Sequence, residues 1–436
     1  MNAFFRAFGT PELRVKIFFT LALLAVYRLG VFIPTPGFDY TNLRLCAEQS
    51  MSQAGEGGNV LGMINLFSGG ALLQMSVFAL GVMPYITASI IIQLLRVAIP
   101  RFEALHKEGA AGTAKLTQYT RYLTIGLGVL QSTTIITLVR SGNFFVGCNL
   151  QVVPDQAVTT LALMVLTMTV GTVLIMWMGE MITERGIGNG MSLLIFTSIA
   201  ASFPTALGQI FTTQGWLTFS LVMVVALVVM VGVVFVEQSQ RRIPVQYAKR
   251  MVGRRMYGGT STYIPVKVNQ SGVIPIIFAS SILTLPQLIT SFGDPSSAWA
   301  QWINAHLVMG VSFSWIYATL YSVLIIFFAF FYTSITFNAE EIADNMKKYG
   351  GFVPGVRAGK PTERYLNYVI NRIQTPGAIY LAVISLIPLL ALVFLSASQN
   401  FPLGGASLLI VIGVGLDTVK QIDAKLQQHH YEGILG

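Results

Sequence analysis

The chain has 436 residues, of which 54% are hydrophobic and only 10% are charged, and its mean hydropathy is +0.67. A soluble domain carries about 25% charged residues, so no water-soluble fold could bury this much apolar surface. The composition therefore predicts an integral membrane protein. The formal net charge of +9 means that basic residues outnumber acidic ones.

The apolar residues form discrete runs along the chain. In order, these lie at about 17–33, 75–99, 122–139, 157–178, 187–207, 216–236, 272–292, 311–337, 377–396 and 404–420. Most are long enough to cross the roughly 30 Å hydrocarbon layer as helices. The first run carries Arg28 and lacks a small-residue cleavage pattern, so we interpret it as a span and not as a signal peptide. The predicted fold class is an all-α polytopic membrane protein with ten transmembrane helices.

Lysine and arginine indicate how these spans are oriented. If ten spans alternate from a cytoplasmic N-terminus, 24 of the 27 Lys and Arg residues fall on the cytoplasmic side, leaving only Arg28, Arg44 and Arg140. Such an excess is typical of cytoplasmic loops. We therefore expect both termini to be cytoplasmic.

Two of the cytoplasmic loops, 237–270 and 338–371, are long and basic. They could simply set the topology and attract anionic lipids. Alternatively, they could form a docking face for a large acidic partner, such as ribosomal RNA or an acidic protein. Each loop is far longer than a plain connection requires, and this length favours docking.

The two cysteines, Cys46 and Cys148, both fall on the outer side in this topology. An oxidising exterior permits them to form a disulfide. Two free thiols are the alternative, and the sequence does not decide between them.

Enzyme motifs are missing from the sequence. It contains no G-x-x-x-x-G-K-[ST] loop, no nucleophile elbow and no H-E-x-x-H motif. The adjacent His429 and His430 fall in the tail, where solvated histidines are more common than a metal site. Few ionisable residues lie within the spans, which argues against an ion-driven carrier. We predict no enzymatic activity, no catalytic residues, no cofactor and no metal.

Some spans are too polar to face lipid. Run 187–207 opens with the polar stretch 187–192, and run 272–292 contains Pro275 and Pro286. Such helices are tolerated where other helices or water satisfy the backbone, so we expect them to line a pathway through the bundle. The stretch 59–75, in contrast, is flanked by glycines and is too short to cross the membrane. It is either a helix on the outer surface or a piece inserted into a central funnel.

Two long stretches resemble the signatures of the SecY family of protein-translocation channels. They are FALGVMPYITASIIIQLL at 78–95 and WMGEMITERGIGNG at 177–190. The resemblance continues through QRRIP at 240–244, YAKR at 247–250, PVKVN at 265–269, GVIP at 272–275, FVPGVRAG at 352–359 and the glycines at 404–405. It covers nearly the whole chain in the order of the family.

The resemblance implies two inverted, pseudo-symmetric halves of five spans each, 1–207 and 208–436, around an hourglass pore. The implied pore ring consists of Val82, Ile86, Ile187, Met191, Ile277 and Ile410. A narrow apolar ring blocks ions by dewetting, yet a passing side chain can push it apart. The segment at about 57–75 resembles the family's plug, with Leu61, Ile64, Asn65, Phe67, Ser68, Gly69 and Gly70. The implied lateral gate has Thr87, Gln93, Gln131 and Asn269 as its polar candidates.

By the same resemblance, the chain would be the central pore-forming subunit of a bacterial translocase in the plasma membrane. It would conduct unfolded polypeptides and release hydrophobic segments sideways into the bilayer. The implied partners are the SecE and SecG membrane subunits, the SecA ATPase, the ribosome, signal sequences, nascent polypeptides and membrane lipids. Candidate contacts for SecA or the ribosome are Arg241, Arg242, Lys249, Arg250, Arg254, Arg255 and Arg357. A secondary transporter for a small solute and a membrane-embedded enzyme are the alternatives, although the sequence shows neither a charged midplane site nor a catalytic dyad.

Overall fold

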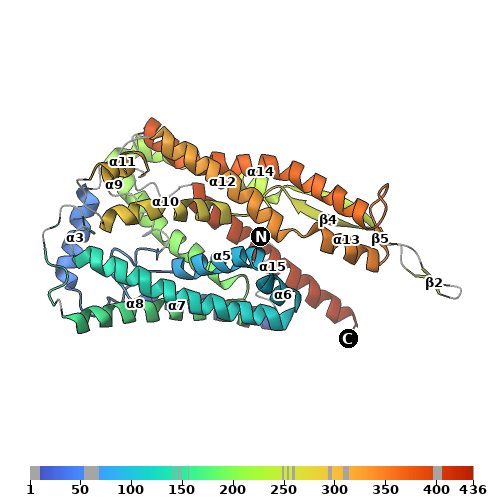
Figure 1. Ribbon diagram of the computed structural model, residues 1–436, viewed down its shortest axis with the longest axis horizontal. Coiled ribbons are helices and arrows are strands. Elements are labelled where there is room, and N and C mark those ends of the chain that lie inside the picture. Colours follow the sequence, from blue (N-terminus) through green and yellow to red (C-terminus); the bar gives the residue numbers. More distant parts are fainter. Residues whose placement is uncertain are drawn as a thin grey trace.

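A computed structural model provides the three-dimensional description of the protein. It describes residues 10–53, 68–140, 142, 144–145, 148, 150–155, 157–247, 250–252, 255–257, 261–292, 297–307, 314–395 and 405–435. The molecule is elongated and mostly helical, and its long helices run roughly along its longest axis (Figure 1).

Thirteen helices are found in the described part of the chain. They are α2 (Pro11–Gly30), α3 (Tyr40–Gln53), α5 (Met83–Ala98), α6 (Pro100–Lys107), α7 (Ala110–Arg140), α8 (Val158–Arg185), α9 (Gly190–Gln238), α10 (Ile274–Phe292), α11 (Ala298–His306), α12 (Trp315–Thr336), α13 (Ala339–Lys348), α14 (Lys360–Leu395) and α15 (Gly405–Leu435). Five strands complete the list: β1 (Gln240–Tyr247), β2 (Arg250–Val252), β3 (Arg255–Tyr257), β4 (Ser261–Lys267) and β5 (Gly351–Phe352).

Each of the ten apolar runs falls wholly or largely within a helix. By length and composition, five helical stretches of the described chain can cross a membrane, and α5 with α6 makes a sixth candidate that is bent by 100°. The polytopic, helical class predicted from the sequence is therefore confirmed. The count of ten spans agrees with the structure but stays a prediction.

Two breaks in the helices have clear sequence causes. Helix α9 contains both run 187–207 and run 216–236, and it is interrupted at Gly215, where φ is +79°. This backbone conformation costs a glycine little. Between α5 and α6, Ile99 is extended and Pro100 begins the new helix, because proline disfavours helical conformation in the residue before it.

The helices pack in two groups that share α9. One group contains α2, α5, α7 and α8, which contact one another and the first part of α9. The other contains α10, α12, α14 and α15 together with the second part of α9. The two predicted halves, 1–207 and 208–436, and their symmetry stay predictions.

The two ends of the molecule differ in structure. Helices α3 and α11 lie at one end, whereas the strands and α13 lie at the other (Figure 1). The strand end is formed by the two long basic loops, and the α3 end includes the predicted outer segments. This separation is the arrangement expected if the spans alternate as predicted.

The two basic loops build one small unit, which the sequence analysis did not predict. Strand β1 of the first loop pairs antiparallel with β4 and also with β5 of the second loop, giving the order β4-β1-β5. Beneath the sheet, apolar residues of β1, β4, α13 and α14 form a separate core that includes Val245, Val266 and Leu366. Strands β2 and β3 form a hairpin that projects beyond this unit (Figure 1).

Candidate functional site

An apolar cluster occupies the place where the two helix groups meet. Helices α2, α5, α8, α9, α10, α12 and α15 all contribute buried residues to it. An ion that entered such a cluster would lose its hydration without gaining a partner. We call it the central cluster.

Five of the six predicted ring residues belong to this cluster. Val82, Met191, Ile277 and Ile410 are buried in it, and Ile86 packs against it. The sixth residue, Ile187, is buried in a different cluster with Leu13, Ile17 and Ile422. The structure thus brings together five candidates from α5, α9, α10, α15 and the turn before α5, and leaves Ile187 apart.

Local hydrogen bonds explain why Ile187 lies apart. Its backbone N–H donates to the hydroxyl of Thr20 in α2 at 3.2 Å. The ammonium of Lys425 in α15 donates to the carbonyl of the neighbouring Gly186 at 3.4 Å. Burial and the nearby Lys16 lower the pKa of Lys425, which lies beyond the last apolar run. Ile187 is therefore held between the start of α2 and the end of α15.

Met191 is positioned by the turn between α8 and α9. The side chain of Asn189 caps α9 by accepting from the N–H groups of Met191 and Ser192. Gly179 and Gly190 face each other across this turn, and a Cβ on Gly190 would collide with the Gly179 carbonyl. Small residues at these two positions let α8 and the first turn of α9 approach closely, which places Met191 at the centre of the bundle.

The described part of the predicted plug, residues 68–75, forms turns between the central cluster and a second apolar cluster that contains Leu72 and Met75. Ala71 is buried in the cluster, and the Ser68 hydroxyl accepts from the N–H of Leu72 at 3.2 Å. Gly69 and Gly70 both have positive φ, at +66° and +92°. The other plug candidates, Leu61, Ile64, Asn65 and Phe67, lie outside the described residues.

Backbone hydrogen bonds fasten this segment to the chain that follows α2. The N–H of Thr35 donates to the Met75 carbonyl at 3.0 Å, and the N–H of Val77 donates to the Ile33 carbonyl at 2.9 Å. Arg28 of α2 also donates from Nη1 to the carbonyl of Gly69 at 2.7 Å. The downstream flank of the plug segment is thus held by these hydrogen bonds and by the burial of Leu72 and Met75.

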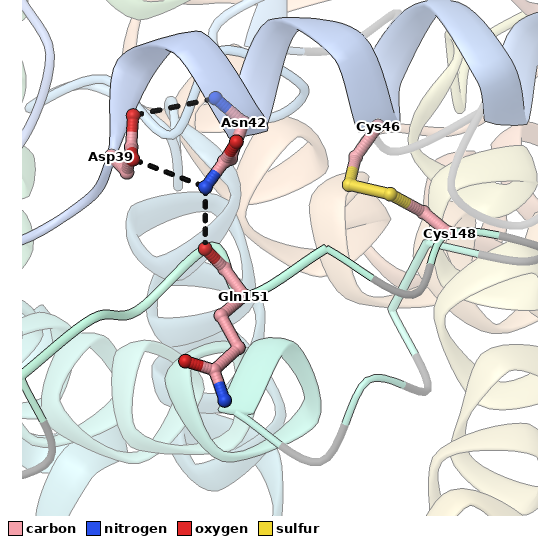
Figure 2. The surroundings of a disulfide bond; sticks show 5 residues. All are labelled: Asp39, Asn42, Cys46, Cys148 and Gln151. Atoms are coloured by element: carbon pink, nitrogen blue, oxygen red, sulfur yellow. Dashed lines mark hydrogen bonds between the residues drawn. A yellow bond between two sulfur atoms is a disulfide. The ribbon is translucent and has the colours of Figure 1, made fainter.

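The upstream flank is held covalently. Cys46 of α3 forms a disulfide with Cys148, and their Cα atoms are 5.3 Å apart. Figure 2 shows that the same helix is tied down by Asn42, whose amide donates to the Gln151 carbonyl at 3.0 Å and to Asp39 at 3.1 Å. Of the two alternatives left open by the sequence, the structure contains the paired cysteines.

The four predicted polar gate residues are not joined to one another by hydrogen bonds. The hydroxyl of Thr87 donates to the Met83 carbonyl of its own helix. Asn269 donates to Glu237 at 2.6 Å and accepts from Ser271 at 3.3 Å. Within the described residues, no hydrogen bond joins any two of Thr87, Gln93, Gln131 and Asn269, so their shared role stays a prediction.

Helices α5, α10 and α12 each contribute apolar residues to the central cluster. Ile90 of α5 belongs to the central cluster together with Phe278 of α10 and Phe328 of α12. The two phenylalanine rings stack with their centroids 5.0 Å apart. Sequence reasoning missed these residues, because isolated apolar side chains in apolar helices carry no signal.

The predicted basic contacts lie on or near the strand end. Arg241 and Arg242 are exposed on β1, and the Arg242 guanidinium lies 4.7 Å from the centre of the Tyr263 ring. Arg357 is exposed between Gly355 and Gly359, both with positive φ. Arg250 and Arg255 belong to the projecting hairpin, while Lys249 and Arg254 lie outside the described residues.

An ion pair that the sequence analysis missed joins α7 to α8. Arg121 donates to both carboxylate oxygens of Glu180, at 2.9 and 2.7 Å. Bidentate pairs of this kind fix geometry more firmly than single contacts. Because the partners are 59 residues apart, no helical spacing links them in the sequence.

These features define a polytopic helical membrane protein whose two helix groups meet at an apolar centre, with a short segment turned against it. A profile of the SecY family matches residues 76–419. The protein translocase subunit SecY of Streptomyces coelicolor is 59% identical over 441 residues, covering 100% of both chains. SecY of Mycobacterium tuberculosis is 55% identical over 443 residues, again covering 100% of both. The chain belongs to the SecY family, as its motifs predicted.

Solved structures share the fold. A structure described as a protein-conducting channel matches with a TM-score of 0.60 and 15% identity, covering 93% of this chain and 91% of its own. A structure from a study of the SecY plug domain matches with a TM-score of 0.58 and 16% identity, with the same coverage. At such low identity these likenesses show a shared fold.

Proposed function

We propose that this chain is the central pore-forming subunit of a protein translocase, which conducts unfolded polypeptides across the membrane. The observation that carries the proposal is the central cluster, in which four of the six predicted ring residues are buried between the two helix groups. Apolar side chains offer no fixed partner, so a passing segment of any sequence can take their place. The names of the full-length relatives, which are translocase subunits, support the same function.

In this proposal the halves 1–207 and 208–436 move apart around the pore, and the segment at about 57–75 is the plug. The burial of Ala71 in the central cluster supports this role, because it joins the segment to the ring candidates. Displacing the segment would remove part of the cluster and leave the ring as the remaining barrier.

The lateral gate lies between α5 and α7 on one side and α10 and α12 on the other. Ile90 of α5 and Phe278 and Phe328 of α10 and α12 support this, because all three are buried in the central cluster. A hydrophobic signal helix can replace such contacts with equivalent ones. Thr87, Gln93, Gln131 and Asn269 would line the path once the seam opens.

The strand end is the docking face for cytoplasmic partners. Its exposed arginines and the shared sheet support docking of the SecA ATPase or of the ribosome, with the basic residues facing carboxylates or ribosomal RNA. SecE and SecG are the proposed membrane partners. The proposed location is the bacterial plasma membrane, with both termini in the cytoplasm.

Site-specific photocrosslinking tests the path of the polypeptide. The chain is purified with SecE and SecG, reconstituted with SecA and ATP, and given a precursor that arrests halfway. A photoreactive residue at Ile277 should crosslink to the arrested precursor, because Ile277 lies in the central cluster. The same probe at Trp315, which is 76% exposed on the surface of the bundle, is the control. Crosslinks at Trp315 but not at Ile277 would refute the proposed path.

A secondary transporter for a small solute remains the alternative. The sheet and the hairpin at the strand end have no evident role in such a carrier, whereas they provide a docking face for a motor. A transporter would also work when purified alone. Uptake of a small solute by the isolated chain, without polypeptide movement in the full complex, would favour the alternative.

A further inference from the structure

Arg28 is a charged residue within the first apolar run, and neither topology nor the ring explains it. It lies in the last turn of α2, and its side chain is partly buried. None of the ion pairs found among the described residues includes Arg28. An arginine within a membrane span is costly to keep and usually marks a functional contact.

The contact that Arg28 makes is with the backbone of the plug segment. Its Nη1 donates to the Gly69 carbonyl at 2.7 Å, and its guanidinium lies 5.4 Å from the centre of the Phe32 ring. Gly69 and Gly70 both have positive φ. A charged donor makes a stronger hydrogen bond to a carbonyl than a neutral one does.

A second hydrogen bond fixes the same place on α2. The hydroxyl of Tyr27 is bonded to that of Ser198 in α9 at 2.6 Å, and Tyr27 is fully buried. Gly69 also packs against Ser198: a Cβ added to Gly69 would come within 3.0 Å of the Ser198 Cα and 3.1 Å of Arg28 Nη1. Helix α2, helix α9 and the plug segment therefore converge at Gly69, two residues before Ala71 enters the central cluster.

We propose that Arg28 is a positioning residue that latches the plug segment in the closed channel by holding the Gly69 carbonyl. This inference rests on the proposed function. The latch binds a backbone atom, so it acts whatever side chains the plug carries. It is also reversible, since water or another polar group can replace the carbonyl when a polypeptide displaces the segment.

The test measures resting ion leak and polypeptide export in vesicles that contain the complete translocase complex. Arg28→Met should raise the leak by roughly 10- to 100-fold, the range expected for loss of a charged hydrogen bond. Gly69→Ala should do the same by pushing the carbonyl away. The double variant should leak no more than the leakier single one, because both changes break one contact. Arg14→Met, a change at an exposed position of the same helix, is the matched control and should leave the leak unchanged.

A conservative variant separates the latch from a merely structural role. Arg28→Lys keeps a cationic donor and should restore most of the seal, while the thermal midpoint stays near that of the wild type. The proposal is overturned if Arg28→Met does not leak, if the two single effects multiply, or if Lys fails as badly as Met. Export by the wild-type complex in the same vesicles tests the proposed function separately, so failure of the latch alone leaves that function standing.

Discussion

The centre of the molecule and its two ends are held together in different ways. At the ends, specific bonds fix the chain: the Cys46–Cys148 disulfide, the Arg121–Glu180 ion pair and the ladder between β1 and β5. At the centre, the helix groups touch through apolar side chains that have no fixed partners. Apolar contacts can be exchanged for others at little cost. The ends are therefore the rigid parts of the molecule, and the centre is the part that can open.

A charged side chain in the central cluster should have the largest effect, because it disrupts the apolar contacts between the helix groups. Ile410 is 2% exposed in the central cluster, so Ile410→Asp would bury a carboxylate without a partner. We expect the closed state to lose about 3 kcal/mol or more, which appears as a large resting leak in reconstituted vesicles. Arg357→Glu on the exposed strand end should not leak at all. If Ile410→Asp does not leak, the central cluster is not the barrier that seals the resting channel.

Removal of the disulfide should affect stability and not the seal. Replacing Cys46 and Cys148 together by serine should lower the free energy of unfolding by about 2–4 kcal/mol. Thermal unfolding of the purified complex measures this loss, and reduction of the wild type should reproduce it. If the serine variant, the wild type and the reduced wild type all unfold at the same temperature, the stability of the α3 end does not depend on this disulfide.

The ion pair between α7 and α8 should have a smaller effect. Arg121→Met leaves Glu180, whose side chain is 18% exposed, without its partner, and we expect a loss of about 1–2 kcal/mol because Arg121 itself is 39% exposed. Adding Glu180→Gln should recover part of the loss. Denaturation of the wild type, the two single variants Arg121→Met and Glu180→Gln, and the double variant forms a double-mutant cycle. Fully additive losses would mean that the pair is not coupled.

The smallest expected change concerns a surface charge at the strand end. Arg357→Glu should slow SecA-dependent export by about fivefold to tenfold, which is typical of a charge at the rim of an interface. Insertion of the subunit into the membrane should be unaffected. Arg364→Glu, an equal charge change in the first turns of α14, is the control. Equal slowing by both variants would point to net charge and not to docking at Arg357.

The sequence predicted the helices well because each span needs a long apolar run, which is visible without any structure. The family resemblance also implied five ring candidates that share one cluster, from four helices and the turn before α5. The sequence analysis missed the sheet, because residues 248–350 separate β1 from β5 along the chain and the two strands become neighbours only in the fold. The placement of Asn269 at the gate stays a prediction, and its hydrogen bond to Glu237 at 2.6 Å could not be read from the sequence because the two residues are far apart along the chain.

The pairing of β1 with β5 has a mechanical consequence. Strand β1 continues directly from α9, β4 leads into α10, and β5 lies between α12 and α14 by way of α13. The sheet therefore links α9, α10, α12 and α14 to one another at the strand end. A partner that displaces the projecting hairpin would therefore move these helices together as a rigid unit. The movement would reach the central cluster, where this helix group meets the other one.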